Sequence, residues 1–132
     1  MYLGAPVNEY FQPTIELDPG RSRITMPAQP SSFHAAGGLH GSVYFKALDD
    51  AAFFAAQTAE SEVFVLTARF EIEFLAPVRG GLLEAIGEVT GENHRVEAAA
   101  TLLVAGEEVA RGRGEFARGG PRLADVASYR DG

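Results

Sequence analysis

The feature that most constrains the fold is a single long helical pattern, followed by a second half with the periodicity of strands. Apolar residues recur at spacings of three and four between residues 43 and 55, which places them on one face of a helix running from about residue 41 to residue 60. A glycine-rich segment, residues 37–41, leads into this helix. After Glu60 the period changes to two, so the remaining chain is predicted to form strands that cover the helix.

Four strands are predicted after the helix, with glycine turns between them. They cover residues 63–75, 82–90, 94–104 and 109–118. In the first, Ala68, Phe70, Ile72 and Phe74 alternate with charged residues, which predicts one core face and one polar face. The turns at Gly80-Gly81 and at residues 91–93 predict hairpins, and Gly106 predicts a third tight turn. Before the helix, a Pro-Gly turn at residues 18–20 predicts a small hairpin, and residues 5–11 one short helical turn.

An antiparallel sheet curled around one central helix is the predicted architecture, in the α+β class. Strands of about ten residues twist and curl around whatever they cover. Four small residues would let the sheet approach the helix closely: Ala98, Ala100, Gly112 and Gly114. The 132 residues are predicted to form one domain, with a core at about residues 33–118 and a polar, partly disordered tail at residues 119–132.

The composition excludes several classes of function. The net charge is −7 and Lys46 is the one lysine, which argues against a nucleic-acid surface. No apolar run reaches the roughly 18 residues of a membrane span, and the first residues lack the pattern of a signal peptide, so a cytoplasmic protein is expected. The absence of cysteine fits that compartment. The three histidines show no paired spacing, so neither a metal nor another cofactor is predicted.

Two adjacent carboxylates, Asp49 and Asp50, lie in the middle of the otherwise apolar helix. A carboxylate held against apolar packing has a raised pKa and is a better base near neutral pH. Adjacent helix residues point about 100° apart, so the two cannot share one site equally: one is a candidate base and the other a solvated or structurally paired carboxylate. The free N–H groups at the helix start, near Gly41, would stabilise an oxyanion; alternatively, the glycines only permit a tight entry into the helix.

The sequence resembles the hotdog-fold acyl-CoA thioesterases of the phenylacetate-degradation type. Leu39-His40-Gly41 is followed by a helix aspartate nine residues after the histidine, and the next strand closes with Phe-Leu-Ala-Pro-Val-Arg-Gly-Gly at residues 74–81. The resemblance runs from about residue 33 to residue 118. It implies a long helix wrapped by an antiparallel sheet, and hydrolysis of an acyl-CoA thioester.

The resemblance also implies roles for individual residues. Gly41 donates its N–H to the thioester carbonyl, Asp49 acts as base or nucleophile, and Thr67 assists with its hydroxyl. His34, His40 and Ser42 are candidate substrate-binding residues. His34 stands where family members commonly carry an asparagine that orients water or substrate, and it either fills that role or lines the loop. His40 has the alternative role of bonding the turn.

Helix geometry predicts a homodimer. Gly41 and Asp49 are eight positions apart, about 12 Å at 1.5 Å per residue, so one thioester carbon cannot touch both within a chain. Two chains with antiparallel helices would bring Asp49 of one copy to Gly41 of the other. The resemblance implies the same arrangement, often with dimers paired into tetramers.

Some functional alternatives stay open at this point. One is a non-catalytic hotdog module that binds acyl-CoA. Another is a hotdog dehydratase, which typically pairs a catalytic histidine with a carboxylate. Four arginines are candidates for the phosphates of coenzyme A or are surface charges: Arg79, Arg95, Arg111 and Arg113.

Overall fold

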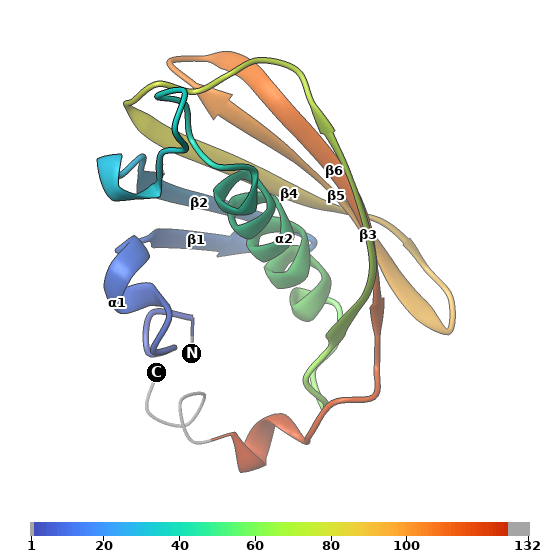
Figure 1. Ribbon diagram of the computed structural model, residues 1–132. Helices are drawn as coiled ribbons and strands as arrows, with labels where there is room; N and C mark the ends of the chain where they lie inside the picture. The colour runs from blue at the N-terminus through green and yellow to red at the C-terminus, as the bar shows by residue number, and fades with distance from the viewer. Residues whose placement is uncertain (1, 127–132) are drawn as a thin grey trace.

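The computed structural model describes residues 2–126, in which one long helix lies across a curved six-stranded antiparallel sheet (Figure 1). The elements are α1 (Asn8–Phe11), β1 (Thr14–Asp18), β2 (Arg21–Pro27), η1 (Pro30–Ser32), α2 (Gly41–Thr58), β3 (Leu66–Phe74), β4 (Leu82–Glu92), β5 (Arg95–Val104), β6 (Glu107–Ala117) and η2 (Leu123–Asp125). The strand order is β1-β2-β4-β5-β6-β3. The predicted α+β architecture is confirmed, and the N-terminal hairpin adds two strands to the four predicted after the helix.

The helix α2 begins and ends close to its predicted bounds. His40 caps its start, because the Nδ1 atom of this residue accepts a hydrogen bond from the Ser42 N–H at 3.1 Å. The buried residues of α2 are Val43, Tyr44, Ala47, Leu48, Ala51, Ala52, Phe54, Ala55, Ala56 and Gln57. The many alanines among these residues keep the helix close to the strands, so the backbone of the sheet determines how α2 is seated.

The closest approach of helix and sheet lies at Gly87 in β4, a residue that the sequence pattern did not single out. A Cβ atom at Gly87 would lie 2.1 Å from the carbonyl oxygen of Ala51. Ser22 in β2 donates a hydrogen bond from its hydroxyl to the same carbonyl at 2.5 Å. This part of the sheet therefore holds the middle of α2 by direct backbone contact.

The small residues of β6 serve a different purpose from the one predicted. Cβ atoms at Gly112 and Gly114 would lie 2.6 and 2.7 Å from the ring of Phe70, which belongs to the neighbouring strand β3. These two glycines make room for an aromatic ring and not for the helix. Ala98 and Ala100 in β5 are buried, as the prediction requires.

The edge strand β3 contains a bulge that changes which side chains face the helix. Its register against β6 pairs Thr67 with Phe116 and Arg69 with Glu115, so Ala68 is the extra residue. Since Phe116 is fully buried, Thr67 also points to the helix side, while Arg69 points outward. The predicted alternation is confirmed from Arg69 to Glu73, but the place of Ala68 on the core face is wrong, because the bulge shifts the alternation by one residue there.

The turns at Gly80-Gly81 and Gly106 lie where they were predicted, whereas Gly91 and Glu92 belong to β4 and the chain turns at residues 93–94. One of the predicted turns does not form a hairpin. Gly81 has a φ of 97° and leads the chain into β4. However, β4 pairs with β2 and β5, whereas β3 pairs with β6, so the predicted hairpin at Gly80-Gly81 is wrong. The hairpins β1–β2, β4–β5 and β5–β6 are confirmed. Turn chemistry thus indicates where a strand ends, but not which strand it pairs with.

Part of the predicted polar tail is packed against the body of the protein. Leu123 is buried, and Arg122 forms a β-bridge with Val63. The rest of the tail, residues 127–132, lies outside the described residues. In the described part of the chain, no helix has the length and apolar character needed to cross a membrane.

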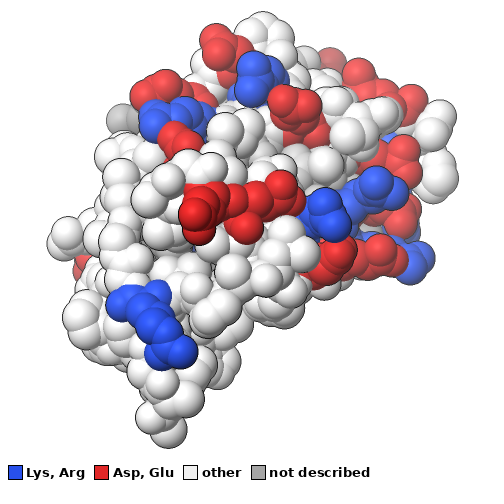
Figure 2. Space-filling view, turned by 90° about the horizontal axis from the view of Figure 1, so that it is seen from above, with Lys and Arg blue, Asp and Glu red and all other residues white. Residues whose placement is uncertain are grey.

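Charged side chains of both signs are interspersed on the surface. Figure 2 shows blue side chains that mostly adjoin red ones. Ion pairs of this kind join neighbouring strands, such as Arg111 with Glu73 at 3.1 Å and Arg21 with Glu88 at 3.4 Å.

Candidate active site

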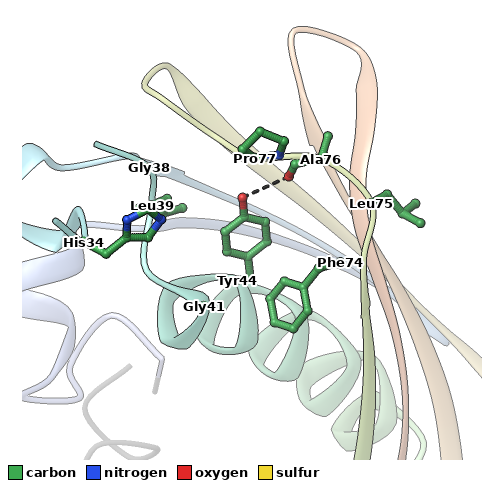
Figure 3. Close-up of a pocket in the computed structure, with 9 residues that line it drawn as sticks. All are labelled: His34, Gly38, Leu39, Gly41, Tyr44, Phe74, Leu75, Ala76 and Pro77. Carbon is green, nitrogen blue, oxygen red and sulfur yellow. Dashed lines mark hydrogen bonds between the residues drawn. The ribbon is translucent and has the colours of Figure 1, made fainter. Parts of the chain in front are cut away.

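A pocket of about 350 Å³ opens at the start of α2 (Figure 3). It lies between the helix start, the loop before it and the end of β3. Nine residues line it: His34, Gly38, Leu39, Gly41, Tyr44, Phe74, Leu75, Ala76 and Pro77. The lining is apolar apart from His34, the Tyr44 hydroxyl and backbone groups, which suits the acyl part of an ester or thioester.

The Gly41 amide is a hydrogen-bond donor at this pocket that has no acceptor within residues 2–126. The His40 N–H donates to the Ser32 carbonyl at 2.9 Å and the Ser42 N–H donates to His40, whereas the Gly41 N–H has no acceptor within residues 2–126. It points out of a helix N-terminus, where the helix dipole favours negative charge. A Cβ at Gly41 would lie 3.5 Å from the Phe74 ring, so a larger residue would intrude on the pocket wall.

The walls of the pocket are fixed by hydrogen bonds between its two loops and the helix. The Tyr44 hydroxyl donates to the Ala76 carbonyl at 3.0 Å, the bond drawn in Figure 3. The Leu39 N–H donates to the Val78 carbonyl at 2.7 Å. Neither Tyr44 nor Phe74, whose rings pack edge to face at 5.1 Å, was predicted as a site residue. Phe74 begins the motif at residues 74–81 but received no role there, and no motif marked Tyr44, whose spacing is that of an ordinary core aromatic.

The three candidate substrate-binding residues occupy two different places. His34 lines the pocket, and its loop is held by the bond from its N–H to the Gly38 carbonyl at 2.8 Å. His40 and Ser42 do not line the pocket. The His40 Nδ1 atom lies 2.8 Å from the Ser42 Oγ atom, and both side chains are exposed at the cap of α2. This geometry is that of the turn-bonding role weighed for His40.

Asp49 and Thr67 form a second polar site, on the outer flank of α2. The Thr67 hydroxyl donates to the Asp49 Oδ1 atom at 2.9 Å. Burial raises the pKa of Asp49 to about 6, while the hydrogen bond from Thr67 opposes this shift. The charge of Asp50 raises this pKa further and that of Lys46 lowers it. The carboxyl group is therefore a base whose pKa lies close to neutral pH.

The two polar sites are separate within one chain. Asp49 and Thr67 do not line the pocket that contains Gly41. Gly41 and Asp49 both belong to α2, where they lie about two turns apart. One chain thus presents, at one end of α2, a backbone N–H with no acceptor in the described residues, and a carboxylate of raised pKa farther along the helix.

Asp50 is structurally paired, which is one of the two roles predicted for it. The Tyr2 hydroxyl donates to the Asp50 Oδ2 atom at 2.6 Å, and the Lys46 Nζ atom lies 2.6 Å from the same oxygen. Sequence analysis missed both partners. The spacing of four residues between Lys46 and Asp50 is a signal for such a pair, but nothing in the sequence indicates that Tyr2 returns to this helix.

The candidate arginines divide into paired and unpaired ones. Arg95 lies 3.5 Å from Glu115, and Arg111 pairs with Glu73, so both are engaged on the sheet. Arg79 reaches the Ala36 carbonyl at 3.5 Å, in the loop next to the pocket. Within residues 2–126, Arg79 and Arg113 form no ion pair with a carboxylate. In the same part of the chain, no group of three or more His, Asp and Glu side chains is placed to hold a metal ion.

Comparison with known proteins identifies a family and related structures. The family model described as the thioesterase superfamily matches residues 36–96. None of the curated proteins matches the sequence significantly. The PaaI protein of the phenylacetic acid degradation operon of E. coli superposes with a TM-score of 0.84 at 21% identity, covering 92% of this chain and 90% of that one.

Two further solved structures have the same fold. A thioesterase family protein from Silicibacter pomeroyi matches with a TM-score of 0.79 at 29% identity, over 89% of this chain and 93% of that chain. A mutant of the phenylacetic acid degradation protein PaaI from Thermus thermophilus matches with a TM-score of 0.79 at 20% identity, over 86% and 99%. The segment matched by the family model contains Gly41, Asp49 and Thr67. The chain therefore has the hotdog fold of these structures, and its residues 36–96 are similar to the thioesterase superfamily.

Proposed function

We propose that the protein hydrolyses acyl-CoA thioesters, with Asp49 as base or nucleophile and Gly41 as oxyanion donor. The observation that carries this proposal is the half-buried Asp49 carboxylate, which has a pKa of about 6 and a Thr67 hydroxyl at 2.9 Å. Such a carboxylate is largely ionised at pH 7 and is more basic than an ordinary aspartate. It lies on the central helix of a thioesterase fold, where a base is required.

The chemistry differs between the two roles of Asp49 but gives the same products. As a base, Asp49 takes a proton from water, whose oxygen attacks the thioester carbon, and the oxyanion accepts a hydrogen bond from the Gly41 N–H. The C–S bond then breaks, and the thiolate takes the proton back from Asp49. As a nucleophile, the Asp49 oxygen attacks the carbon and the C–S bond breaks to release the thiolate. Water then hydrolyses the mixed anhydride, which restores the Asp49 carboxylate, and the proton from this water goes to the thiolate. Either route consumes one water and yields the free acid and coenzyme A.

The proposed assembly is a homodimer, alone or paired into a tetramer, in which each site is shared by two chains. The separation of Gly41 and Asp49 within one chain supports it, because no substrate carbon reaches both. Within residues 2–126, β3 is an edge strand of the sheet and pairs only with β6. Large apolar side chains are exposed on this edge and on the nearby face of α2: Phe45, Leu66, Phe74 and Leu75. A two-fold axis beside β3 would cover them and bring Asp49 of one copy to Gly41 of the other.

The remaining site residues are proposed to support this reaction. Thr67 holds the Asp49 carboxylate in place through its hydrogen bond. His34 lies in the pocket and takes the place of the family asparagine in orienting water or substrate. His40 and Ser42 hold the helix start, so that the Gly41 N–H stays directed at the substrate carbonyl.

Replacing Asp49 with asparagine is expected to abolish turnover of acyl-CoA. Loss of a catalytic base or nucleophile should lower kcat at least about 100-fold, because asparagine neither accepts the proton nor attacks the carbon. The measurement is release of free thiol from a panel of aryl, short, medium and long acyl-CoAs. Asp18→Asn, an exposed carboxylate at the end of β1, serves as the matched control and is expected to keep full activity.

Two results would contradict the proposal. One is an Asp49→Asn variant that is as fast as the wild type on every thioester tested. The other is a wild-type protein that binds acyl-CoA but hydrolyses none of the panel, which would favour the non-catalytic binding module. Circular dichroism of both variants verifies that any loss of activity is not a loss of fold.

A further inference from the structure

A buried ion pair lies on α2 directly beside Asp49. The Lys46 Nζ atom and the Tyr2 hydroxyl both lie 2.6 Å from the Asp50 Oδ2 atom. The side chains of Lys46 and Asp50 are only 16% and 15% exposed. A pair buried to this degree adds little net stability, because the loss of hydration of two charges offsets their attraction. Its position next to the proposed catalytic carboxylate suggests another role.

Lys46 stands within reach of two carboxylates. It precedes Asp49 by three residues and Asp50 by four, and side chains at both spacings are neighbours on a helix surface. In the structure the ammonium binds Asp50, while Thr67 supplies the hydrogen bond to Asp49. An ammonium bound to Asp49 instead would favour its ionised form and weaken it as a base.

Two aromatic rings of the N-terminal segment lie beside the Lys46 ammonium. The Lys46 Nζ atom lies 5.3 Å from the centre of the Tyr2 ring and 5.4 Å from that of Phe11, so both rings attract the ammonium to the Asp50 side. Tyr2 is itself anchored, because its ring packs against Phe54 at 4.8 Å and its carbonyl accepts a bond from the Asn8 side chain at 2.8 Å. Tyr2 thus fixes both the carboxylate and the cation.

We propose that Asp50, held by Tyr2, is a positioning residue that keeps Lys46 away from Asp49 and so leaves Asp49 free to take a proton. This inference rests on the proposed function, in which Asp49 is the reacting carboxylate. The charged groups that act on Asp49 are Lys46 and Asp50 of its own helix, and β3, which packs against it, presents the Thr67 hydroxyl. Burial sets most of the upward pKa shift of Asp49, and the balance between Asp50 and Lys46 adjusts it.

The pH dependence of kcat/KM tests this proposal through shifts of opposite sign. Wild-type kcat/KM is expected to fall below about pH 6, as Asp49 becomes protonated, and this fall is the acid limb of the pH profile. Lys46→Met removes a cation that lowers the pKa of Asp49, so this acid limb should move up by about one pH unit. Asp50→Asn removes an anion and releases Lys46 toward Asp49, so the limb should move down by about one pH unit. The double variant should return close to the wild-type limb.

The choice of substrate and of control variants ensures that the acid limb of kcat/KM reports the ionisation of Asp49. A neutral thioester of N-acetylcysteamine replaces acyl-CoA, because a phosphate monoester titrates near pH 6 itself. Arg69→Met removes an exposed cation from the outward side of β3 and should leave the limb in place. The position of the limb does not depend on the amount of folded enzyme, so a destabilised variant still reports it. Tyr2→Phe keeps the ring but loses the bond to Asp50, and it should move the limb down by a smaller amount.

The outcomes separate this inference from the proposed function. If wild-type protein hydrolyses no thioester, or Asp49→Asn is fully active, the proposed function fails. If the wild type is active but Lys46→Met and Asp50→Asn move the limb in the same direction, or not at all, the positioning role is overturned. If Asp50→Asn does not fold, the other two variants test the positioning role of Asp50. An acid limb that stays in place in either Lys46→Met or Tyr2→Phe then overturns this role.

Discussion

At the scale of single residues, the orientation of Thr67 depends on one extra amino acid in its strand. With regular alternation, Thr67 would share a face with Arg69 and point to solvent. The bulge at Ala68 reverses this and directs the hydroxyl at Asp49. Bulges of this kind are common where a strand must re-aim a side chain toward a site.

Removing the Thr67 hydroxyl is expected to raise the pKa of Asp49 above about 6. The bond from Thr67 stabilises the ionised carboxylate, so its loss in Thr67→Val favours the protonated form. The acid limb of kcat/KM should then move to higher pH, and activity at pH 6 should fall more than activity at pH 8. Thr67→Ser keeps the donor and is expected to behave as wild type. A pH profile of Thr67→Val that superposes on that of the wild type would exclude this role for the hydroxyl.

The catalytic candidates were accessible from sequence to different degrees. Asp49 was found from its place in an apolar helix, and its raised pKa follows from the burial that the pattern predicts. Thr67 came only from the resemblance, because the periodicity put it on the polar face. Tyr2 was not accessible at all, since it reaches Asp50 across 48 positions of the chain through a fold that no local pattern records.

At the scale of elements, the seating of α2 depends on the missing side chain at Gly87. The helix backbone lies against β4 here, and Ser22 bonds the same carbonyl that a Cβ would strike. The sequence pattern pointed to four other small residues, because any glycine or alanine in a strand satisfies the requirement for close approach. Which of them meets the helix depends on the register between strands, which only the assembled sheet defines.

The substitution Gly87→Ala is expected to destabilise the fold by at least about 1–3 kcal/mol. The added Cβ would lie 2.1 Å from the Ala51 carbonyl oxygen, so α2 or β4 must shift, and overpacking at a buried site carries a cost of this order. The measurement is the midpoint of urea unfolding. Gly119→Ala is the control, because nothing lies within 4 Å of a Cβ there, and it should change stability by less than about 0.5 kcal/mol. Equal midpoints for the two variants would show that the helix is not seated at this contact.

At the scale of the whole molecule, the sheet topology leaves the proposed site half-built in each chain. The pocket with Gly41 lies at one end of α2, and Asp49 lies two turns away beside the open edge at β3. The sequence already predicted this separation, since helical rise alone sets it. Phe74, which is exposed at the end of β3, was assigned to the core face, because alternation does not distinguish a core from an interface.

Mixing two inactive variants is expected to restore activity. Chains with Asp49→Asn and chains with Gly41→Leu each lack one component of both sites in their own dimers. In a mixed dimer one site retains both components, and since half of the dimers are mixed, about a quarter of the wild-type activity should return. The measurement is thiol release after the two proteins are unfolded and refolded together, with tags to verify subunit exchange. Exchange without any return of activity would place the whole site within one chain.

The strand order also dictates when this protein can fold as it is synthesised. The hairpin of β1 and β2 joins the sheet by pairing with β4. The strand β3 pairs only with β6, which is the last of the six described strands to be synthesised. The sheet can therefore cover the apolar face of α2 only after most of the chain has left the ribosome, because pairings between distant parts of the sequence dominate the sheet. A chain released before β6 would already contain Asp49 and Thr67, but it would lack the strand whose register turns the threonine toward the aspartate.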